Sequence, residues 1–370
     1  MGTGPEIDPI KRCACAATLV LAVSGAQAQS VAIYGLVDLA VEHVTAVGSP
    51  ASGLTRMPSL TGGLPSRIGL RGSEDLGAGL RAVFTLEQGF APDQGTINQG
   101  GRAWGRQSFV GLAGNWGTVS FGRQYTMLFW SLLEADVMGP ALYGTGSLDA
   151  YIPNARADNT FAYRGTFGGL TLGATYSLGR DAVNVGSPAG TNCAGESAAD
   201  PQACREWSAL LKYDNPAWGA ALAVDEFHGG AGAFAGLTSS AMTDRRVSAN
   251  GYVKLGGVKL TLGLVRREND ASATTPKSDL WYTGASWPVT DLLTLEAQGH
   301  ALRYQGGSDA VLGALRGTYS LSRRTAMYAA WGYIDNGAGL AISVSAGAGG
   351  SNPAPGATQQ ALAVGMRHSF

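Results

Sequence analysis

Arginine is concentrated in one part of the chain. Eight of the 21 arginines fall between residues 67 and 164. A guanidinium group stays positively charged at physiological pH, so it binds anions and does not act in proton transfer. Arg67 and Arg71 alternate with the apolar Ile68 and Leu70, which places both charges on one face of a strand. This pattern predicts a charged wall that attracts anions.

A stretch that is both apolar and acidic follows most of these arginines. Residues 124–158 hold an apolar run around Phe129, and after it come the acids Glu134, Asp136 and Asp149. An exposed loop with that much apolar surface would be sticky. We therefore expect the loop to pack against an inner wall and to turn its acids toward the open space beside it.

No constellation typical of an enzyme is present. The histidines are isolated from one another, at positions His43, His228, His300 and His368. The chain has no His-Glu-x-x-His, no Gly-x-Ser-x-Gly and no phosphate-binding loop. We predict no catalytic residue, no metal site and no cofactor. A hydrolase that needs only a serine and a histidine on adjacent strands is the alternative.

The elements that position these residues are predicted to be β-strands. In residues 31–41, Val31, Ile33 and Val37 alternate with small or polar residues such as Asp38, which is the period of a strand with two different faces. The same period recurs along the chain, for example in residues 293–301. The sequence is therefore all-β.

The connections between these segments alternate between short and long. Gly168-Gly169 and Gly256-Gly257 are short, whereas stretches such as 45–64 and 179–205 are long and rich in small residues. Counting between the connections gives sixteen strands, from about 30–44 to 358–370. Such a meander is typical of a transmembrane barrel with short periplasmic turns and long extracellular loops.

A membrane barrel is favoured over a soluble sandwich by the position of the tryptophans. Trp116, Trp218 and Trp287 each stand beside a short turn, as an aromatic girdle at a membrane interface requires. Closure into a barrel also satisfies every backbone group in lipid. We predict a single 16-stranded antiparallel transmembrane β-barrel, and in lipid Arg67 and Arg71 must then face its lumen. A soluble sandwich is the alternative.

The overall charge excludes one class of partner. The formal net charge is −1 and only 14% of the residues are charged, so nothing attracts the whole chain to nucleic acid. We predict no nucleic-acid binding. Any electrostatic effect must come from local clusters of charge.

The N-terminal residues have the pattern of a secretory signal. Lys11-Arg12 is followed by the apolar stretch 16–23 and by the small-x-small site Ala26-Gln27-Ala28. We predict a signal peptide at residues 1–28 and a barrel domain at 29–370. A short buried helix is the alternative, since the apolar stretch is shorter than the roughly 20 residues that span a bilayer.

Two cysteines lie within the predicted barrel domain. Cys193 and Cys204 stand in a stretch rich in Gly, Ala, Ser and Pro. In an oxidising compartment we expect a local disulfide between them. Two free thiols are the alternative.

Six motifs are spread over essentially the whole predicted barrel domain. They are Ser30-Val-Ala-Ile-Tyr-Gly-Leu-Val-Asp38, Ser66-Arg-Ile-Gly-Leu-Arg-Gly-Ser-Glu-Asp-Leu-Gly-Ala-Gly-Leu80, Gly105-Arg-Gln-Ser-Phe-Val-Gly-Leu112, Gly117-Thr-Val-Ser-Phe-Gly-Arg-Gln124, Tyr319-Ser-Leu-Ser-Arg-Arg-Thr325 and Val364-Gly-Met-Arg-His-Ser-Phe370. Together, and in this order, they resemble one family, the general (trimeric) porins of Gram-negative bacteria, in the branch typical of β-proteobacteria.

The resemblance implies several structural features. Three copies would assemble into a homotrimer, the third long loop would fold into the lumen, and Phe370 would belong to the signal read by the barrel-assembly machinery. Arg81, Arg106 and Arg123 occupy positions where similar porins carry basic wall residues. A bulge or a strand end would shift the face of Arg106 or Arg123. The alternative for each arginine is a rim position, where it pairs with acids or binds lipopolysaccharide phosphates.

The resulting functional hypothesis is a water-filled channel in the Gram-negative outer membrane for passive diffusion of small hydrophilic solutes and ions. The predicted constriction has a basic wall and an acidic loop, and its size and charge would limit passage. Because five arginines face three acids in it, we predict mild anion preference, which neutralising Arg67 and Arg71 should shift toward cations. An adhesin or receptor barrel is the main alternative.

Overall fold

The first strand, β1 (Ser30–Val47), shows why this sequence forms a membrane barrel. Its odd-numbered apolar residues point outward, and Val31 and Ile33 are 54% and 66% exposed. Its even-numbered acids Asp38 and Glu42 are fully buried inside. A soluble protein would reverse this order, because apolar surface is stabilised by removal from water. The outward apolar face is therefore suited to lipid, as the predicted membrane barrel requires.

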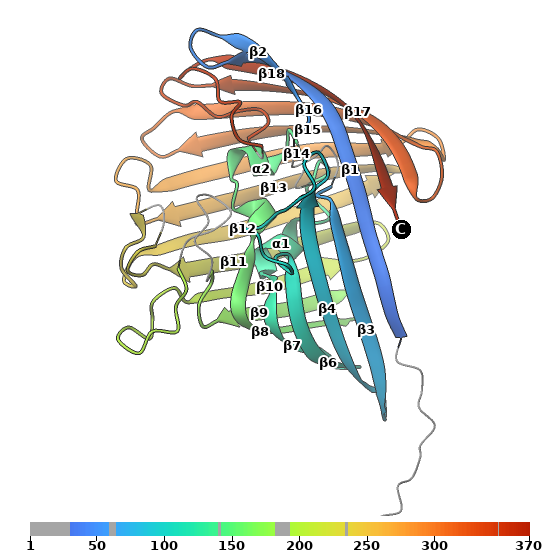
Figure 1. Cartoon of the computed structure of the whole chain (residues 1–370). Helices are drawn as coiled ribbons and strands as arrows, with labels where there is room; N and C mark the ends of the chain where they lie inside the picture. The colour runs from blue at the N-terminus through green and yellow to red at the C-terminus, as the bar shows by residue number, and fades with distance from the viewer. Residues whose placement is uncertain (1–29, 59–63, 140–141, 182–192, 234–235, 347) are drawn as a thin grey trace, which may run out of the picture.

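Figure 1 shows a closed barrel in the computed structural model, which describes residues 30–58, 64–139, 142–181, 193–233, 236–346 and 348–370. Within these residues sixteen long antiparallel strands cross the barrel, which confirms the predicted number. Two short strands, β2 (Ser52–Arg56) and β5 (Thr96–Ile97), lie in long connections. The strands after β1 are β3 (Arg67–Gly77), β4 (Leu80–Ala91), β6 (Gln107–Gly114), β7 (Gly117–Tyr125), β8 (Arg156–Phe167), β9 (Leu170–Ser177), β10 (Glu206–Asp214), β11 (Trp218–His228), β12 (Thr243–Leu255), β13 (Val258–Asn269), β14 (Lys277–Pro288), β15 (Leu293–Tyr304), β16 (Asp309–Ser320), β17 (Thr325–Asn336) and β18 (Thr358–Ser369).

The barrel closes where the last strand pairs with the first. β18 runs antiparallel to β1, with Leu36 opposite Ser369. The backbone N–H of Gly35 donates to the carbonyl of Phe370 at 3.0 Å, and the Phe370 ring covers Gly35 so closely that a Cβ there would overlap it. Closure leaves no strand edge unpaired in lipid.

The short turns have the residues that their geometry demands. Gly168 and Gly169 join β8 to β9, and both have positive φ angles, 56° and 92°. A two-residue hairpin turn with two positive φ angles matches the twist of the flanking strands, and glycine adopts it without steric cost. The predicted short turns are thus confirmed at this position.

One long connection crosses the interior of the barrel. Residues 126–155, here named the internal loop, join β7 to β8 and contain α1 (Met127–Leu132), α2 (Thr145–Leu148) and the 3₁₀ turn η1 (Ile152–Asn154). Figure 1 shows α1 and α2 inside the barrel, and α1 packs against β10, β11 and β12. Met127, Leu128 and Leu132 of the apolar run are buried there, as the sequence predicted, whereas Phe129 and Trp130 are half-buried and Leu133 is exposed.

Another long connection carries the predicted cysteine pair. The structure joins Cys193 to Cys204 by a disulfide between β9 and β10. The predicted signal peptide, residues 1–28, lies outside the described residues. No helix in the described ranges is long and apolar enough to cross a membrane.

Candidate functional site

The inner face of β3 and β4 holds two arginines around one carboxylate. Arg67 points inward, opposite the lipid-facing Ile68, as alternation predicted. Glu87 accepts a hydrogen bond from Nε of Arg106 at 2.7 Å and lies 3.5 Å from Nε of Arg67. The hydroxyl of Tyr34 also donates to Glu87, at 2.9 Å. A single negative charge therefore holds two positive charges on this wall.

A third arginine joins this group through a tyrosine of β7. The hydroxyl of Tyr125 accepts from Nη2 of Arg106 at 2.6 Å and from Nη2 of Arg156 at 2.8 Å. The Arg156 guanidinium also lies 4.4 Å from the centre of the Tyr125 ring. That ring stacks on Phe129 with centroids 3.8 Å apart and meets Trp130 edge-on at 5.9 Å. We name Arg67, Arg106 and Arg156 the arginine cluster. With Glu87 it carries a formal charge of plus two.

Arg123 does not belong to this cluster. A bulge at Gly122, with φ of +126°, shifts the register of β7, and a Cβ there would meet the carbonyl of Ser108 at 2.2 Å. Beyond the bulge Arg123 donates to Asp158 at 2.6 Å. Arg102 binds the same carboxylate at 3.2 Å and also pairs with Asp181. Arg123 thus lies in an ion-pair network toward the long loops, which corrects its place in the predicted basic wall.

The other two predicted wall residues lie toward the short turns. Arg71 faces inward, and its guanidinium is 5.3 Å from the centre of the Tyr34 ring. Arg81 is exposed at the start of β4, opposite Asp75. It precedes Glu87 by six residues, which is about 20 Å along a strand. Arg81 is therefore too far along the strand to belong to the arginine cluster. The prediction that five arginines form one basic wall is corrected accordingly.

The three acids of the internal loop bind partners other than the arginine cluster. Glu134 receives a hydrogen bond from Nζ of Lys259 on β13 at 2.7 Å. Asp136 is 7% exposed and accepts from Thr145 at 2.5 Å and from the N–H of Gly139 at 3.1 Å. Burial in the loop raises the pKa of Asp136 to about 6. The prediction that Asp136 turns toward open space is wrong, because the loop folds over it.

Asp149 is held by an arginine on the opposite wall. Arg246 on β12 donates to its two oxygens at 2.7 and 3.1 Å, and the N–H of Tyr151 adds a bond at 3.0 Å. Although burial alone would raise it, the pKa of Asp149 is lowered to about 2, chiefly by the charge of Arg246. This carboxylate also does not face the arginine cluster. The loop crosses the barrel, so its acids meet the basic residues of the far wall.

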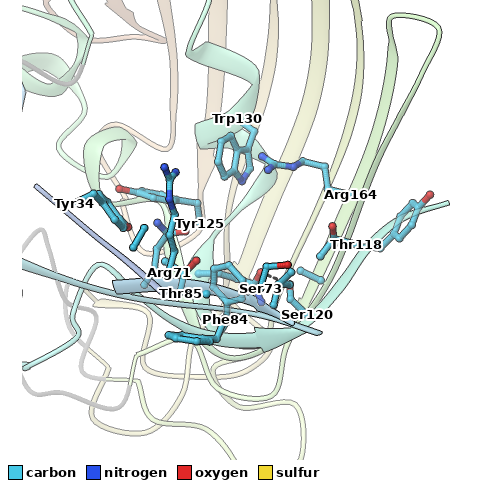
Figure 2. Close-up of a pocket in the computed structure, with 18 of the residues that line it drawn as sticks. Tyr34, Arg71, Ser73, Phe84, Thr85, Thr118, Ser120, Tyr125, Trp130 and Arg164 are labelled. Carbon is cyan, nitrogen blue, oxygen red and sulfur yellow. Dashed lines mark hydrogen bonds between the residues drawn. The ribbon is translucent and has the colours of Figure 1, made fainter. Parts of the chain in front are cut away.

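Below the arginine cluster, on the short-turn side, lies a cavity of 710 Å³. Figure 2 shows Arg71 and Arg164 entering it from different strands, with Trp130 of α1 above them. The Arg164 guanidinium is 3.7 Å from the centre of the Trp130 ring. We name this space the vestibule cavity.

The sequence did not single out several residues of this site. Arg156 and Tyr125 lie directly opposite each other on the paired strands β7 and β8, and Glu87 of β4 joins them through Arg106. One signal was available for Glu87, since it alternates with Leu86 and Gln88 in a strand and a charge in such a strand avoids the lipid face. Together these residues form a cluster with a local excess of fixed positive charge on the inner wall; Arg67 is half-buried, and Arg106 and Arg156 are buried. Such an excess suits the attraction of anions.

Comparison with known families identifies similar sequences. Residues 16–339 match a family described as Gram-negative porin. The outer membrane porin protein 32 of Delftia acidovorans is 30% identical, with 96% of this chain and 98% of that protein covered. An outer membrane porin protein of Bordetella pertussis is 28% identical, over 98% of this chain and the whole of that protein.

Solved structures show the same architecture. An anion-selective porin from Comamonas acidovorans superposes with a TM-score of 0.75 at 26% identity, with 93% of this chain and all of that chain covered. OmpT, an outer membrane protein of Vibrio cholerae, has a TM-score of 0.63 at 14% identity, over 92% and 98% of the two chains. The second likeness concerns the fold alone.

Proposed function

The chain belongs to the Gram-negative porin family, and on that premise we propose that its outer-membrane channel favours small anions over cations. The observation that carries this proposal is the arginine cluster, in which Arg67, Arg106 and Arg156 have only Glu87 as a carboxylate partner among the described residues. A fixed positive excess beside a narrow passage raises the local concentration of anions. The related Comamonas porin, described as anion-selective, supports the same reading.

The internal loop strengthens this bias. Its acids would counter the arginines if they contacted them, but Asp136 is bound by Thr145 and Gly139 within the loop, and Asp149 is neutralised by Arg246. Fixed charges are screened over about 8–10 Å at physiological salt. Nearby uncompensated arginines therefore set the ion preference more than distant charges do, and small hydrophilic solutes pass by diffusion.

The test replaces two members of the arginine cluster. In the double variant Arg67→Gln/Arg106→Gln, the local formal charge falls from plus two to zero, because Arg156 and Glu87 remain. We expect the ratio of anion to cation permeability, measured from the reversal potential in a KCl gradient, to fall several-fold.

The control is Arg323→Gln/Arg324→Gln, which removes the same charge from an exposed turn between β16 and β17. Its permeability ratio should stay near that of the unmodified protein. An equal ratio in both double variants would contradict the role given to the arginine cluster.

Assembly into a homotrimer is part of the proposal. The family resemblance supports it, and the outward face of the barrel is apolar enough to meet lipid or another copy. Purified protein in mild detergent should migrate as three chains before heating and as one chain after it. A single-chain mass before heating, with a folded barrel, would contradict the trimer.

Phe370 is proposed to serve recognition by the barrel-assembly machinery. Its ring is 45% exposed at the β1–β18 seam, where an external partner can reach it. Phe370→Ala should lower the amount of folded barrel in the outer membrane while the purified chain still refolds in detergent. Equal amounts of both proteins in cells would count against this role.

Lipopolysaccharide is the proposed lipid partner at the long-loop ends of the strands. Arg245, Arg266 and Arg303 face outward there, above the lipid-facing Trp281. Guanidinium groups bind phosphates. Arg245→Gln/Arg303→Gln should reduce the lipopolysaccharide that copurifies with the protein, whereas Arg323→Gln should not.

We further propose that the chain is a passive pore without enzymatic activity. Apart from Arg71 and Arg164, which stand over aromatic rings, the interior charged groups described above are engaged in structural ion pairs and hydrogen bonds. The two contacts between a histidine and a threonine hydroxyl among the described residues are exposed. Purified protein should not hydrolyse chromogenic esters or peptides above the buffer rate. Turnover that survives purification of the folded barrel would contradict this.

A further inference from the structure

The vestibule cavity has a mixed lining of polar and apolar side chains without an acid. Twenty residues surround it, and none of these described residues is acidic. Ten of them carry a hydroxyl or an amide, and two carry a guanidinium, namely Arg71 and Arg164. Its 710 Å³ falls within the roughly 300–1,000 Å³ typical of small-molecule sites. The space therefore combines positive charge with many neutral hydrogen-bonding groups.

Neither arginine is neutralised by a protein carboxylate. Within the described chain no Asp or Glu lies within 4 Å of Arg71 or Arg164, whose guanidinium groups instead stand over the rings of Tyr34 and Trp130. A ring contacts the flat face of a guanidinium, so the N–H groups in its plane stay available for a ligand. The rings hold the two charges in place without cancelling them.

A threonine stands beside each arginine on the same inner surface. Arg71 is directly opposite Thr85 across β3 and β4, and Arg164 is directly opposite Thr118 across β7 and β8. Side chains in such pairs have Cβ atoms about 4.5–5.5 Å apart. A small ligand bound by either charge is thus within reach of a hydroxyl.

We propose that the vestibule cavity is a binding station for small hydroxylated organic anions, such as sugar acids. This inference rests on the proposed anion-favouring pore and names a class of solute for it. The carboxylate of the solute binds Arg71 or Arg164, and its hydroxyls exchange hydrogen bonds with Thr85, Thr118 and their polar neighbours. A cation would find no acid here. An aliphatic carboxylate would gain the contact with the arginine but not the hydrogen bonds of the hydroxyl and amide groups, which would remain with water.

The experiment uses interruptions of single-channel current by added solutes. Gluconate, hexanoate and glucose are added in turn on the short-turn side of the bilayer. Gluconate and hexanoate are both six-carbon monocarboxylates, but only gluconate has hydroxyls, and glucose has hydroxyls without charge. The unmodified protein should be interrupted by gluconate at lower concentration than by hexanoate or glucose.

Two sets of variants test the assigned residues. Arg71→Gln/Arg164→Gln should raise the apparent Kd of gluconate about tenfold, as the loss of a charge-assisted hydrogen bond implies. Arg323→Gln/Arg324→Gln, with the same loss of charge, should leave it unchanged. Thr85→Val/Thr118→Val should weaken gluconate several-fold and leave hexanoate as it was, which identifies hydroxyl recognition without altering charge.

The outcomes separate this inference from the proposed function. Equal interruption by gluconate and hexanoate in the unmodified protein would overturn hydroxyl recognition. An unchanged gluconate Kd in the arginine variant would overturn the assignment to this cavity. Either result can occur with an anion-favouring reversal potential in KCl, so only this inference would then fail. A cation-favouring reversal potential would instead remove the proposed function.

Discussion

On one wall of the barrel Arg67 and Arg106 share the carboxylate of Glu87, and Arg156 is bound to Tyr125 with no carboxylate partner among the described residues. On the opposite wall the basic residues that face the internal loop each have their own carboxylate. Arg246 binds Asp149 and Lys259 binds Glu134. The same type of charge thus has two consequences. In the arginine cluster, where acids are scarce, the positive charge contributes to the electric field in the channel. On the opposite wall, where each basic residue has an acidic partner, the charge holds the internal loop in place.

The wall opposite the arginine cluster also holds the internal loop through hydrogen bonds to backbone carbonyls. Arg316 on β16 pairs with Glu296 at 2.6 Å and donates to the carbonyls of Met138 and Val137 at 3.1 and 3.0 Å. Such bonds carry no net charge into the passage. The number of inward-facing arginines therefore predicts ion selectivity poorly unless the partners of those arginines are known.

The largest effect is expected when one arginine of each wall is replaced by glutamine in separate variants. Arg246→Gln leaves Asp149 buried without its cation, and breaking a buried pair costs about 3–5 kcal/mol. We expect a clear loss of unfolding free energy in urea, together with noisier single-channel current. Arg156→Gln should instead change ion selectivity and cost less stability, because no carboxylate among the described residues loses a partner. Equal losses of stability would erase the distinction between the walls.

The next effect concerns pH and the buried Asp136. Its pKa is raised to about 6, so the folded protein holds a proton that the unfolded chain releases near pH 4. This contribution to stability is fully present below pH 4 and is lost as pH rises through 6, on the order of 3 kcal/mol. Asp136→Asn should flatten the pH dependence of the unfolding free energy between pH 4 and 6. An unaltered slope would contradict the burial argument.

Tyr125→Phe should give a smaller effect on the arginine cluster. The hydroxyl accepts from Arg106 and Arg156, but Arg106 keeps its bond to Glu87 in the variant. The main loss is therefore one hydrogen bond to a charged group, which contributes about 1.5–3 kcal/mol. The ring and its stacking on Phe129 remain. We expect a modest loss of stability and a small change in conductance, while the sign of the reversal potential is kept. Reversal of the sign would mean that the hydroxyl, and not the excess of arginine, sets selectivity.

The smallest effect on the unfolding free energy is expected at the exposed ion pair that attaches the internal loop to β13. The Glu134 side chain is 45% exposed in its pair with Lys259, and surface pairs contribute about 0–1 kcal/mol. Glu134→Gln should therefore leave the unfolding free energy nearly unchanged. A loss as large as that of Arg246→Gln would show that exposure does not distinguish the two attachments.

Much of the barrel could be predicted from local patterns. Alternation in 31–41 and 293–301, short turns such as Gly168-Gly169, and the inward faces of Arg67 and Arg71 all follow from the two-residue period of a strand. The apolar run around Phe129 also indicated a loop packed inside. Each of these features depends on neighbours in the sequence.

The partners of the charged residues could not be predicted in the same way. Arg123 changes direction at a bulge that only the fold around Gly122 specifies. Asp149 finds Arg246 across the barrel, 97 residues away in the chain. Such pairs depend on the path of the internal loop through the lumen, and no local period encodes that path. The sequence therefore predicted a charged constriction but not which charges compensate one another.

The central claim is that the arginine cluster gives the channel its ion preference. The most direct test is the reversal potential of the unmodified protein in a planar bilayer under a KCl gradient. We predict a reversal potential whose sign shows that chloride passes more readily than potassium. In Arg67→Gln/Arg106→Gln this potential should be smaller in magnitude. A potential of the opposite sign from a steadily conducting, folded barrel would contradict it.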